Sequence, residues 1–276
     1  MSFFKRRAFA TALALVLFAV LAVIFGIYDL RISQAIVNQE SSFGRALEVL
    51  GVLVAPIFAT LAGLTVMIFF IQEKNASYRK WKITFSCFVA AAGIGYTLYV
   101  FADFSLWQRI GYTIVTFFLY IAAAVLLFKA PRSLLYELMR IAVVTLFYLV
   151  ALLILVDALK LCWGRIRFRQ LSDFSQFTPW YKPRGFTGYA SFPSGHTANA
   201  TALYALTLCA PLIKSRAGKA MCYIVPGVWI VTMAASRVLV GAHYASDVLF
   251  GAAISIALFY LVRRLVLPRI RPLSAK

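Results

Sequence analysis

The sequence predicts an all-α protein, a polytopic bundle of about eight transmembrane helices that form a single integral membrane domain. Hydrophobic residues make up 63% of the chain and charged residues only 13%, a composition unlike that of soluble proteins. Several apolar runs reach the roughly 20 residues that a helix needs to cross a bilayer. The net charge of +19 is explained by basic cytoplasmic loops and anionic headgroups, so we expect a membrane partner and no nucleic acid.

The first apolar run, residues 8–28, follows the basic residues Lys5, Arg6 and Arg7. A signal peptide would have a shorter apolar core and a small-residue cleavage site, so we expect this run to be retained as a span. Residues 31–47 are mixed in polarity and are interpreted as an interfacial helix. Further spans are expected at residues 48–71, 83–101, 110–128 and 141–159.

A long polar loop follows the fifth span and is rich in Arg, Gly, Pro and aromatic residues. The remaining spans are expected at residues 197–213, 220–240 and 244–262. Most lysines and arginines fall at the two termini and in three loops on the same side. By the positive-inside rule, both termini then face the cytoplasm, and the long loop and both histidines lie on the outer side of the cell membrane.

The chain contains only two histidines, and each lies where an apolar run meets a polar segment. His196 ends the stretch Pro193-Ser194-Gly195-His196, and His243 follows Gly241-Ala242. Imidazole has an unperturbed pKa near neutrality, so it can act as a nucleophile or as a proton donor. These two boundary positions are the first candidates for a catalytic site.

His243 and Asp247 are four residues apart and would share a face if both lay on a helix. A carboxylate that accepts a hydrogen bond from one ring nitrogen fixes the tautomer and leaves a lone pair on the other. A nucleophilic histidine needs this arrangement. The alternative is a histidine–aspartate pair that serves only to dock two helices.

Basic residues cluster after the fifth span, where Lys160 is followed by Arg165, Arg167 and Arg169. Together with Arg237 they could donate charge-assisted hydrogen bonds to phosphate oxygens. They could also be a solvated basic loop whose lysine extends to the headgroups. A pairing of Lys160 with Asp157, one turn earlier, is a further hypothesis.

Ser194 and Gly195 precede an expected helix start, where unpaired backbone N–H groups suit an anion and a glycine permits its close approach. An ordinary turn and helix cap is the alternative reading. Cys87, Cys209 and Cys222 fall in apolar runs, and no cysteine spacing supports a disulfide framework or a zinc site. No acidic cluster is available for Mg²⁺, so we expect neither a metal nor another cofactor.

Taken together, the three motifs resemble those of the type 2 phosphatidic acid phosphatase family, which shares its site with the vanadium haloperoxidases. Lys160 and Arg167 match the first motif, residues 193–196 the second, and Arg237, His243 and Asp247 the third. Phe168 stands where the family usually has proline, so Arg165 or Arg169 could share the role of Arg167. The resemblance places the catalytic part at residues 141–266 and makes some spans among residues 1–140 additions to a six-span core.

The resemblance implies that His243 attacks phosphorus to form a phosphohistidine, that Asp247 orients it, and that His196 protonates the leaving oxygen. The phosphoryl oxygens would be bound by the remaining motif residues, namely Lys160, Arg167, Ser194, Gly195 and Arg237. The expected substrate is a lipid phosphate or pyrophosphate, such as undecaprenyl pyrophosphate, phosphatidylglycerophosphate, phosphatidic acid or lipid A.

The sequence leaves the choice of lipid and the oligomeric state open. Trp163 and Trp180 suit recognition of a headgroup or plain interfacial anchoring. A lipid phosphotransferase would use the same residues. A transporter is the alternative from another class of protein, because boundary charges and many spans suit it also.

Overall fold

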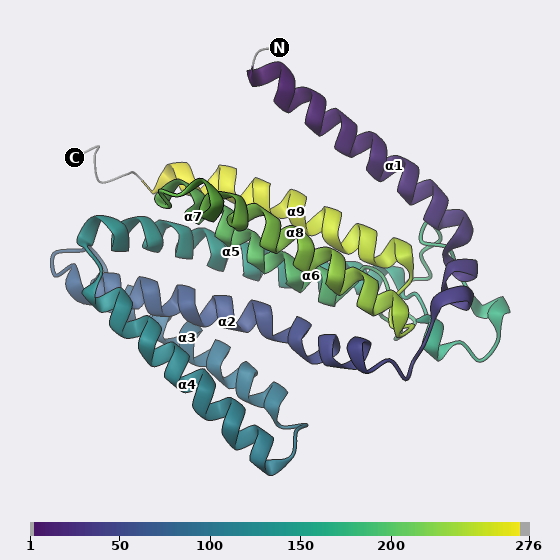
Figure 1. Cartoon of the computed structure of the whole chain (residues 1–276), viewed down its shortest axis with the longest axis horizontal. Coiled ribbons are helices and arrows are strands. Elements are labelled where there is room, and N and C mark those ends of the chain that lie inside the picture. Colours follow the sequence, from purple (N-terminus) through teal and green to yellow (C-terminus); the bar gives the residue numbers. More distant parts are fainter. Residues whose placement is uncertain (1–2, 271–276) are drawn as a thin grey trace. The chain divides into compact units, whose positions relative to one another are not determined.

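The computed structural model describes residues 3–270, with side chains from Ala8 onward, and this part of the chain contains helices and no strand. The long helices are labelled in Figure 1. They are α1 (Phe3–Ile36), α2 (Ser42–Gln72), α3 (Arg79–Phe101), α4 (Leu106–Lys129), α5 (Arg132–Trp163), α8 (Arg216–Leu239) and α9 (Ala245–Val266). The all-α prediction is confirmed for the described residues.

Seven helices among the described residues are long and apolar enough to cross a membrane. The span expected at residues 197–213 is not one of them. This segment consists of consecutive short pieces, α6 (Gly195–Ala200), a 3₁₀ turn, α7 (Ala205–Cys209) and a second 3₁₀ turn that contains Pro211. Proline has no N–H to continue a helix, which fits the end of the segment there. The total of eight spans therefore stays a prediction.

The interfacial helix expected at residues 31–47 is wrong. Residues 31–36 continue α1, and α2 already begins at Ser42. Ser33, a polar residue of this segment, is fully buried inside the protein, as is Asp29 just before it. The polar side chains at this end of α1 are therefore packed against other parts of the protein.

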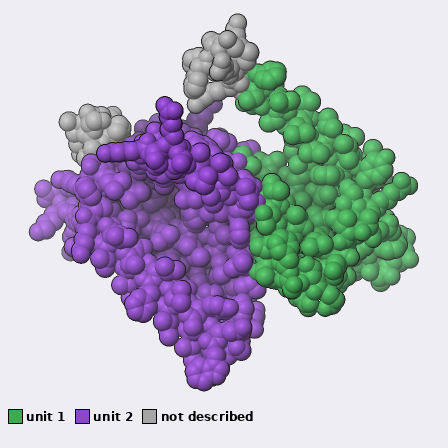
Figure 2. All heavy atoms as spheres, in the orientation of Figure 1, with its two compact units in different colours: residues 1–48, 154–198, 230–256 green, residues 49–153, 199–229, 257–276 purple. Residues whose placement is uncertain are grey.

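The chain divides into two compact units, which are coloured separately in Figure 2. Each unit is formed by several segments that alternate along the sequence. Unit 1 comprises residues 1–48, 154–198 and 230–256, and unit 2 comprises the rest. Every residue singled out from the three motifs falls in unit 1. The last part of α1 and the first turns of α2 belong to the same unit, although they precede the motifs by more than a hundred residues.

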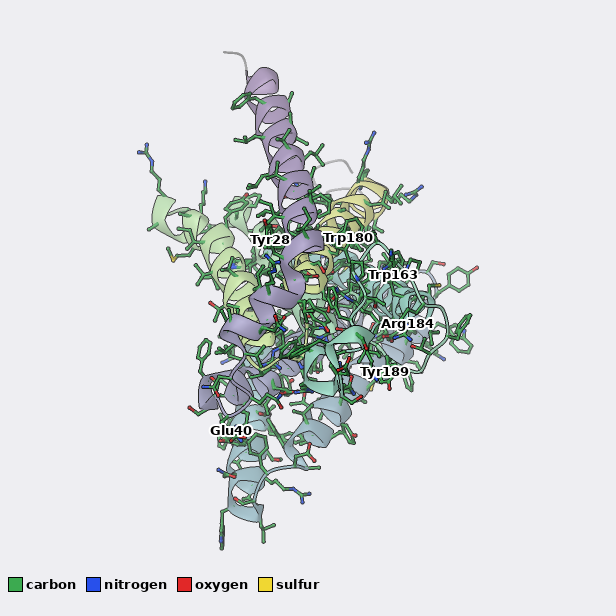
Figure 3. All side chains as sticks on the ribbon, turned by 90° about the vertical axis from the view of Figure 1, so that its right-hand side faces the viewer. Tyr28, Glu40, Trp163, Trp180, Arg184 and Tyr189 are labelled. Carbon is green, nitrogen blue, oxygen red and sulfur yellow. The ribbon has the colours of Figure 1, made fainter. Side chains whose placement is uncertain are left out.

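Within unit 1, the long loop between α5 and α6 lies against α1 (Figure 3). The indole Nε1 of Trp180 donates a hydrogen bond to the backbone oxygen of Ala22, 2.9 Å away. A Cβ on Gly26, one helical turn further, would lie 3.0 Å from the same nitrogen. Trp163 at the end of α5 stacks on Phe192, with ring centroids 4.8 Å apart. These contacts hold the loop that connects the first and second motifs.

Within unit 2, α2 and α3 approach each other closely at small residues. A Cβ on Gly63 would lie 2.8 Å from the backbone nitrogen of Ala90, and one on Gly93 would lie 2.7 Å from the backbone oxygen of Pro56. Such glycines let two helix backbones pack directly, which is a common way for helices to associate in membranes.

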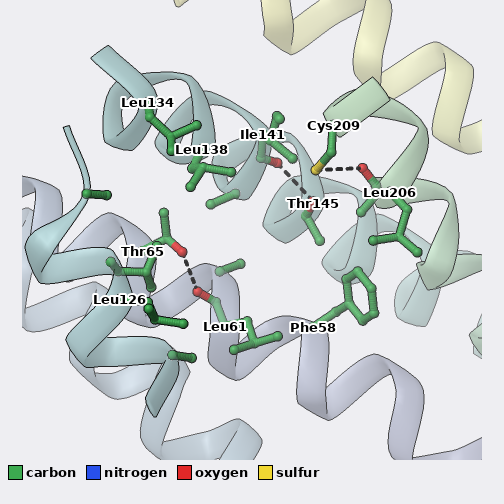
Figure 4. Close-up of a pocket in the computed structure, with 16 residues that line it drawn as sticks. Phe58, Leu61, Thr65, Leu126, Leu134, Leu138, Ile141, Thr145, Leu206 and Cys209 are labelled. Atoms are coloured by element: carbon green, nitrogen blue, oxygen red, sulfur yellow. Dashed lines mark hydrogen bonds between the residues drawn. The ribbon is translucent and has the colours of Figure 1, made fainter. Parts of the chain in front are cut away.

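Unit 2 also contains an apolar cavity of about 410 Å³ between α2, α4, α5 and α7 (Figure 4). Its polar side chains are satisfied within their own helices, since Thr65 donates to Leu61 O and Thr145 donates to Ile141 O. The thiol of Cys209 also lines the cavity and donates to Ala205 O, and the rest of the lining is aliphatic or aromatic, including Phe58 and Leu206. This cavity suits a hydrocarbon.

Candidate active site

The third motif spans the turn between α8 and α9. Arg237 lies in the last turn of α8, and the backbone reverses at Gly241, whose φ of +66° favours glycine. His243 lies in this turn, whereas Asp247 lies in the first turn of α9. His243 therefore precedes the helix instead of sharing its face with Asp247, as the spacing had suggested. The two side chains are nevertheless close, with Nδ1 of His243 3.7 Å from Oδ2 of Asp247.

The ring of His243 is oriented chiefly by a backbone carbonyl. Its Nδ1 lies 2.7 Å from the backbone oxygen of Ser191, and because a carbonyl only accepts, this nitrogen carries the hydrogen. The other nitrogen, Nε2, then holds the lone pair of the neutral ring. Burial lowers the pKa of His243, an effect that Asp247 opposes. The site thus presents an uncharged imidazole with a fixed tautomer.

Asp247 is completely buried and surrounded by hydrogen-bond donors. Its carboxylate accepts from the Ser191 hydroxyl at 2.5 Å, from Arg165 Nη1 at 2.6 Å and from the backbone N–H of Tyr244 at 3.0 Å. A buried carboxylate is stable only when it is paired and hydrogen-bonded in this way. The negative charge beside His243 is therefore held in one position.

Arg165 connects this carboxylate to the N-terminal part of the chain. The guanidinium is 1% exposed and donates through Nη2 to Asp29 of α1 at 2.9 Å, while Nη1 contacts Asp247. It also lies over the ring of Tyr244, 4.1 Å from the centroid. Asp29 accepts in addition from the backbone N–H and the hydroxyl of Ser246. Arg165 is thus committed to two carboxylates and does not share the role expected for Arg167.

The second motif packs directly on the third. The backbone N–H of Ser194 donates to the backbone oxygen of Asp247 at 3.0 Å, and its hydroxyl accepts from Thr197 at 3.0 Å. A Cβ on Gly251 of α9 would lie 2.7 Å from the backbone oxygen of Ser194. The helix that follows, α6, has only six residues. The motif is therefore placed mainly by its packing against α9.

His196 points toward the first turns of α2. Its Nε2 lies 3.1 Å from the backbone oxygen of Glu48, so this nitrogen carries the hydrogen and Nδ1 is left with a lone pair when the ring is neutral. Burial lowers the pKa of His196 to about 4, the charge of Arg237 and the neighbouring ring of His243 act in the same direction, and the carboxylate of Glu48 opposes them. The ring is consequently neutral at pH 7 in the absence of a bound anion.

The first motif supplies two cations at the end of α5 and beyond it. Lys160 forms an ion pair with Asp157 at 3.0 Å, as hypothesised, and its Nζ lies 3.0 Å from where a Cβ on Gly195 would be. Arg167 is partly buried, and its Nε has no hydrogen-bond partner in the protein. Burial and the neighbouring Arg169 lower its pKa, because positive charge accumulates there without full compensation.

Arg237 is fully buried and is bound by the beginning of α2. It donates through Nη2 to the backbone oxygen of Gly44 and through Nε to Ser236 Oγ at 3.2 Å. Its Nη1 makes no hydrogen bond and lies 3.4 Å from a carboxylate oxygen of Glu48. Arg237 and Arg167 thus each retain a buried N–H without an acceptor, a feature that is rare unless a ligand completes the site.

The structure brings together the residues that the motifs singled out. Contacts join Lys160 to Gly195, Ser194 to Asp247 and Arg237 to Glu48 beside His196. Arg167 lies close enough to His243 to lower the pKa of that imidazole. Three cations therefore surround two neutral imidazoles, an arrangement that can bind an anion and attack it.

Sequence reasoning missed three residues that complete the site, namely Asp29 of α1, Glu48 of α2 and Ser191 of the long loop. It named Arg165 but not the contacts of Arg165 with two carboxylates. Asp29 gave a usable signal, because an ionisable residue at the end of an apolar span is expensive unless it is paired. Nothing in the local sequence marked Ser191 or Glu48.

Comparisons with known proteins agree with the motifs. Residues 141–271 match the profile of the PAP2 superfamily. A stretch of 76 residues is 42% identical to phosphatidylglycerophosphatase B of Bacillus subtilis (strain 168) and covers 26% of this chain and 37% of that protein. A stretch of 118 residues is 33% identical to the lipid A 1-phosphatase of Rhizobium johnstonii and covers 42% of this chain and 43% of that protein.

These matches are local, since the chain spans less than half the length of the relatives it matches. No solved structure matches the chain. The profile match nevertheless contains all three motifs, from Lys160 to Asp247, and both relatives have names that denote phosphatases. The segment that carries the three motifs therefore matches the PAP2 superfamily.

Proposed function

We propose that this protein is a membrane lipid phosphatase that hydrolyses a lipid phosphate or pyrophosphate through a phosphohistidine intermediate. The observation that carries the proposal is the contact between His243 Nδ1 and the backbone oxygen of Ser191, which leaves the Nε2 lone pair available for attack. The names of the relatives support substrates of the phosphatidylglycerophosphate or lipid A type. Undecaprenyl pyrophosphate and phosphatidic acid fit the same chemistry.

In the first step, Nε2 of His243 attacks phosphorus and the bond from phosphorus to the lipid oxygen breaks. His196 gives a proton to that oxygen, so the product is a lipid alcohol or, from a pyrophosphate, a lipid monophosphate. In the second step, water attacks the phosphohistidine and the bond from Nε2 to phosphorus breaks. Inorganic phosphate leaves, and the neutral ring of His243 is restored.

The protonation state of His196 depends on the substrate in this mechanism. Burial and Arg237 hold its pKa at about 4 in the free protein, where the ring is neutral at pH 7. A phosphate bound among the cations would neutralise Arg237 and place negative charge beside the ring, which raises the pKa of His196. The ring can then take up the proton that it later gives to the leaving oxygen.

We propose that Lys160, Arg167 and Arg237 bind the phosphoryl oxygens and that the reaction needs no metal ion. The support is the chemistry of the donors, because the charge that phosphoryl transfer requires is supplied by lysine and arginine. The carboxylates nearby are already paired, Asp247 with Arg165 and Glu48 with Arg237. Activity that a chelator abolishes and Mg²⁺ restores would contradict this part of the proposal.

We also propose that the site faces the outer side of the cell membrane, with the catalytic part at residues 141–266. The support is the concentration of lysine and arginine in the loops on the other side. The terminal basic residues used in that argument, such as Lys5 and Lys276, lie outside the residues whose side chains the structure describes. Labelling of the exposed Cys162 by a membrane-impermeant thiol reagent in intact cells would test the orientation.

The decisive experiment measures phosphate release from a panel of lipid phosphates by the purified protein and by the variants His243→Ala and His196→Ala. We expect the wild type to release phosphate without an added lipid acceptor and His243→Ala to release none. Release that requires an acceptor would indicate a phosphotransferase. Unchanged release by His243→Ala would refute the phosphohistidine.

A further inference from the structure

Glu48 is an acidic side chain placed among the cations of the site. It lies on α2, in the part of the chain that precedes the family match, and its carboxylate contacts two arginines. One oxygen is 3.3 Å from Arg169 Nη2, and the other is 3.4 Å from Arg237 Nη1. Because Arg237 is an expected phosphate ligand, the carboxylate occupies a position where a phosphoryl oxygen would be expected.

The two contacts are loose. Charge-assisted hydrogen bonds between arginine and carboxylate are usually about 2.7–2.9 Å long. Arg237 Nη1 makes no hydrogen bond, although the side chain is completely buried. The Glu48 side chain is 35% exposed, so it has a route into solvent. The carboxylate of Glu48 therefore compensates the charge of Arg237 but leaves the N–H groups of Nη1 without a hydrogen bond.

We propose that the carboxylate of Glu48 occupies the phosphate-binding position in the free protein and is displaced when the substrate binds. Its competition with phosphate would lower the affinity of the site for phosphate. This inference rests on the proposed function and adds to it a residue that determines affinity. A phosphoryl group carries more charge and more acceptors than one carboxylate, so it can replace Glu48 at Arg237 and also satisfy the free Nε of Arg167. After hydrolysis, the returning carboxylate would favour release of the product phosphate.

The same turn of α2 contacts His196 through the backbone oxygen of Glu48. That contact does not depend on the side chain, so substitution of Glu48 leaves it available. The effect of the carboxylate on phosphate binding can therefore be measured separately from the position of the imidazole. A change in KM and in phosphate inhibition is expected, because the competition acts on binding.

The test compares the purified wild type with Glu48→Gln, which removes the charge and preserves the size. Glu40→Gln is the matched control, since Glu40 is 86% exposed and pairs with Arg45 away from the phosphate-binding cations. Binding of inorganic phosphate is measured as the increase in Tm with phosphate concentration, and also as competitive inhibition of lipid hydrolysis. The Tm readout works even if the lipid substrate is not the proposed one.

We expect Glu48→Gln to bind inorganic phosphate more tightly by a factor on the order of tenfold, because charges this close interact strongly even in a partly solvated site. The KM for the lipid should fall in parallel, and Glu40→Gln should behave as the wild type. Glu48→Asp, which restores the charge, should return phosphate binding toward the wild-type value. Unchanged or weaker phosphate binding by Glu48→Gln would overturn the inference.

The outcomes for the two proposals are distinguishable. If the wild type hydrolyses lipids and Glu48→Gln binds phosphate as Glu40→Gln does, the inference fails and the proposed function stands. If no lipid is hydrolysed but Glu48→Gln binds phosphate more tightly, the proposed function fails, and the competition between Glu48 and phosphate is supported. Should Glu48→Gln not fold, Glu48→Met replaces it as a neutral side chain of similar size. Failure of both neutral variants to fold would show that the carboxylate is a permanent structural partner and would also overturn the inference.

Discussion

The backbone oxygen of Ser191 lies 2.7 Å from Nδ1 of His243, a full ångström closer than the carboxylate of Asp247. Ser191 also donates its hydroxyl to that carboxylate at 2.5 Å. One residue of the long loop therefore orients the imidazole with its carbonyl and the aspartate with its side chain. The carboxylate of Asp247 also opposes the lowering of the pKa of His243 that burial causes.

The proposed role of His196 as proton donor predicts that its contribution to the rate depends on the leaving group. His196→Ala should lose about 10²–10⁴-fold in the rate of hydrolysis of a lipid phosphate, whose alkoxide needs a proton to leave. The loss should be much smaller with p-nitrophenyl phosphate, because nitrophenolate leaves without protonation. Steady-state rates of the two substrates measure this difference. Equal losses would mean that His196 binds phosphate and does not donate a proton.

The buried contact between Asp29 and Arg165 predicts a large loss of stability in Asp29→Asn. Both side chains are almost completely inaccessible to solvent, and Arg165 would keep Asp247 as its counter-charge but lose the anionic acceptor that Asp29 provides. The expected cost is about 1–3 kcal/mol of the free energy of unfolding, because buried donors are left with a weaker acceptor. Thermal unfolding in detergent measures it, with the exposed Glu40→Gln as the control. A Tm equal to that of the control would contradict the structural role of this pair.

The close approach of α9 to the second motif predicts that Gly251→Ala disturbs the site without changing any polar group. The added methyl would lie 2.7 Å from the backbone oxygen of Ser194, so either α9 or the motif must shift. We expect a lower kcat and weaker phosphate binding. Gly227→Ala in α8 is the control, because a Cβ there meets nothing within 4 Å. Comparable activity of the two variants would refute the prediction.

The low pKa of His196 predicts an acid-sensitive contribution to stability. Its pKa is about 4 in the folded protein and about 6.5 in an unfolded chain. Between these pH values the unfolded chain binds the additional proton, so the free energy of unfolding falls as the pH is lowered from about 6.5 to about 4. Above that range the contribution is constant.

The measurement for this prediction is the Tm as a function of pH for the wild type and for His196→Gln. The variant should lose less stability on acidification, because its side chain does not titrate. Parallel curves for the two proteins would show that His196 has a normal pKa in the folded state.

The sequence was sufficient to predict the helical class, most of the long helices and the residues of the three motifs. Apolar runs report membrane helices directly because the bilayer imposes their length. The motif residues could be recognised because their spacing is local, as between His243 and Asp247. The interfacial helix expected at residues 31–47 was wrong, because mixed polarity alone does not show that a polar residue such as Ser33 is buried or that the helix breaks between Ile36 and Ser42.

The partners of Asp29 and Glu48 could not be predicted, because these contacts join residues more than a hundred positions apart. Asp29 meets Arg165 and Ser246, and Glu48 meets Arg169 and Arg237. No periodicity or local spacing encodes such pairs. The contact between the Ser191 carbonyl in the long loop and His243 in the turn between α8 and α9 likewise has no local signal in the sequence.

The carboxylate of Asp29 gives the first helix a role that its apolar composition conceals. A fragment restricted to residues 141–271 would keep every motif. It would lack Asp29, one of the two carboxylates that the Arg165 guanidinium contacts, and would retain only Asp247. It would also lose the Gly44 carbonyl that caps Arg237. The matched segment by itself thus lacks contacts that its buried arginines make in the full chain, and shortened versions of this protein should be designed to retain the first two helices.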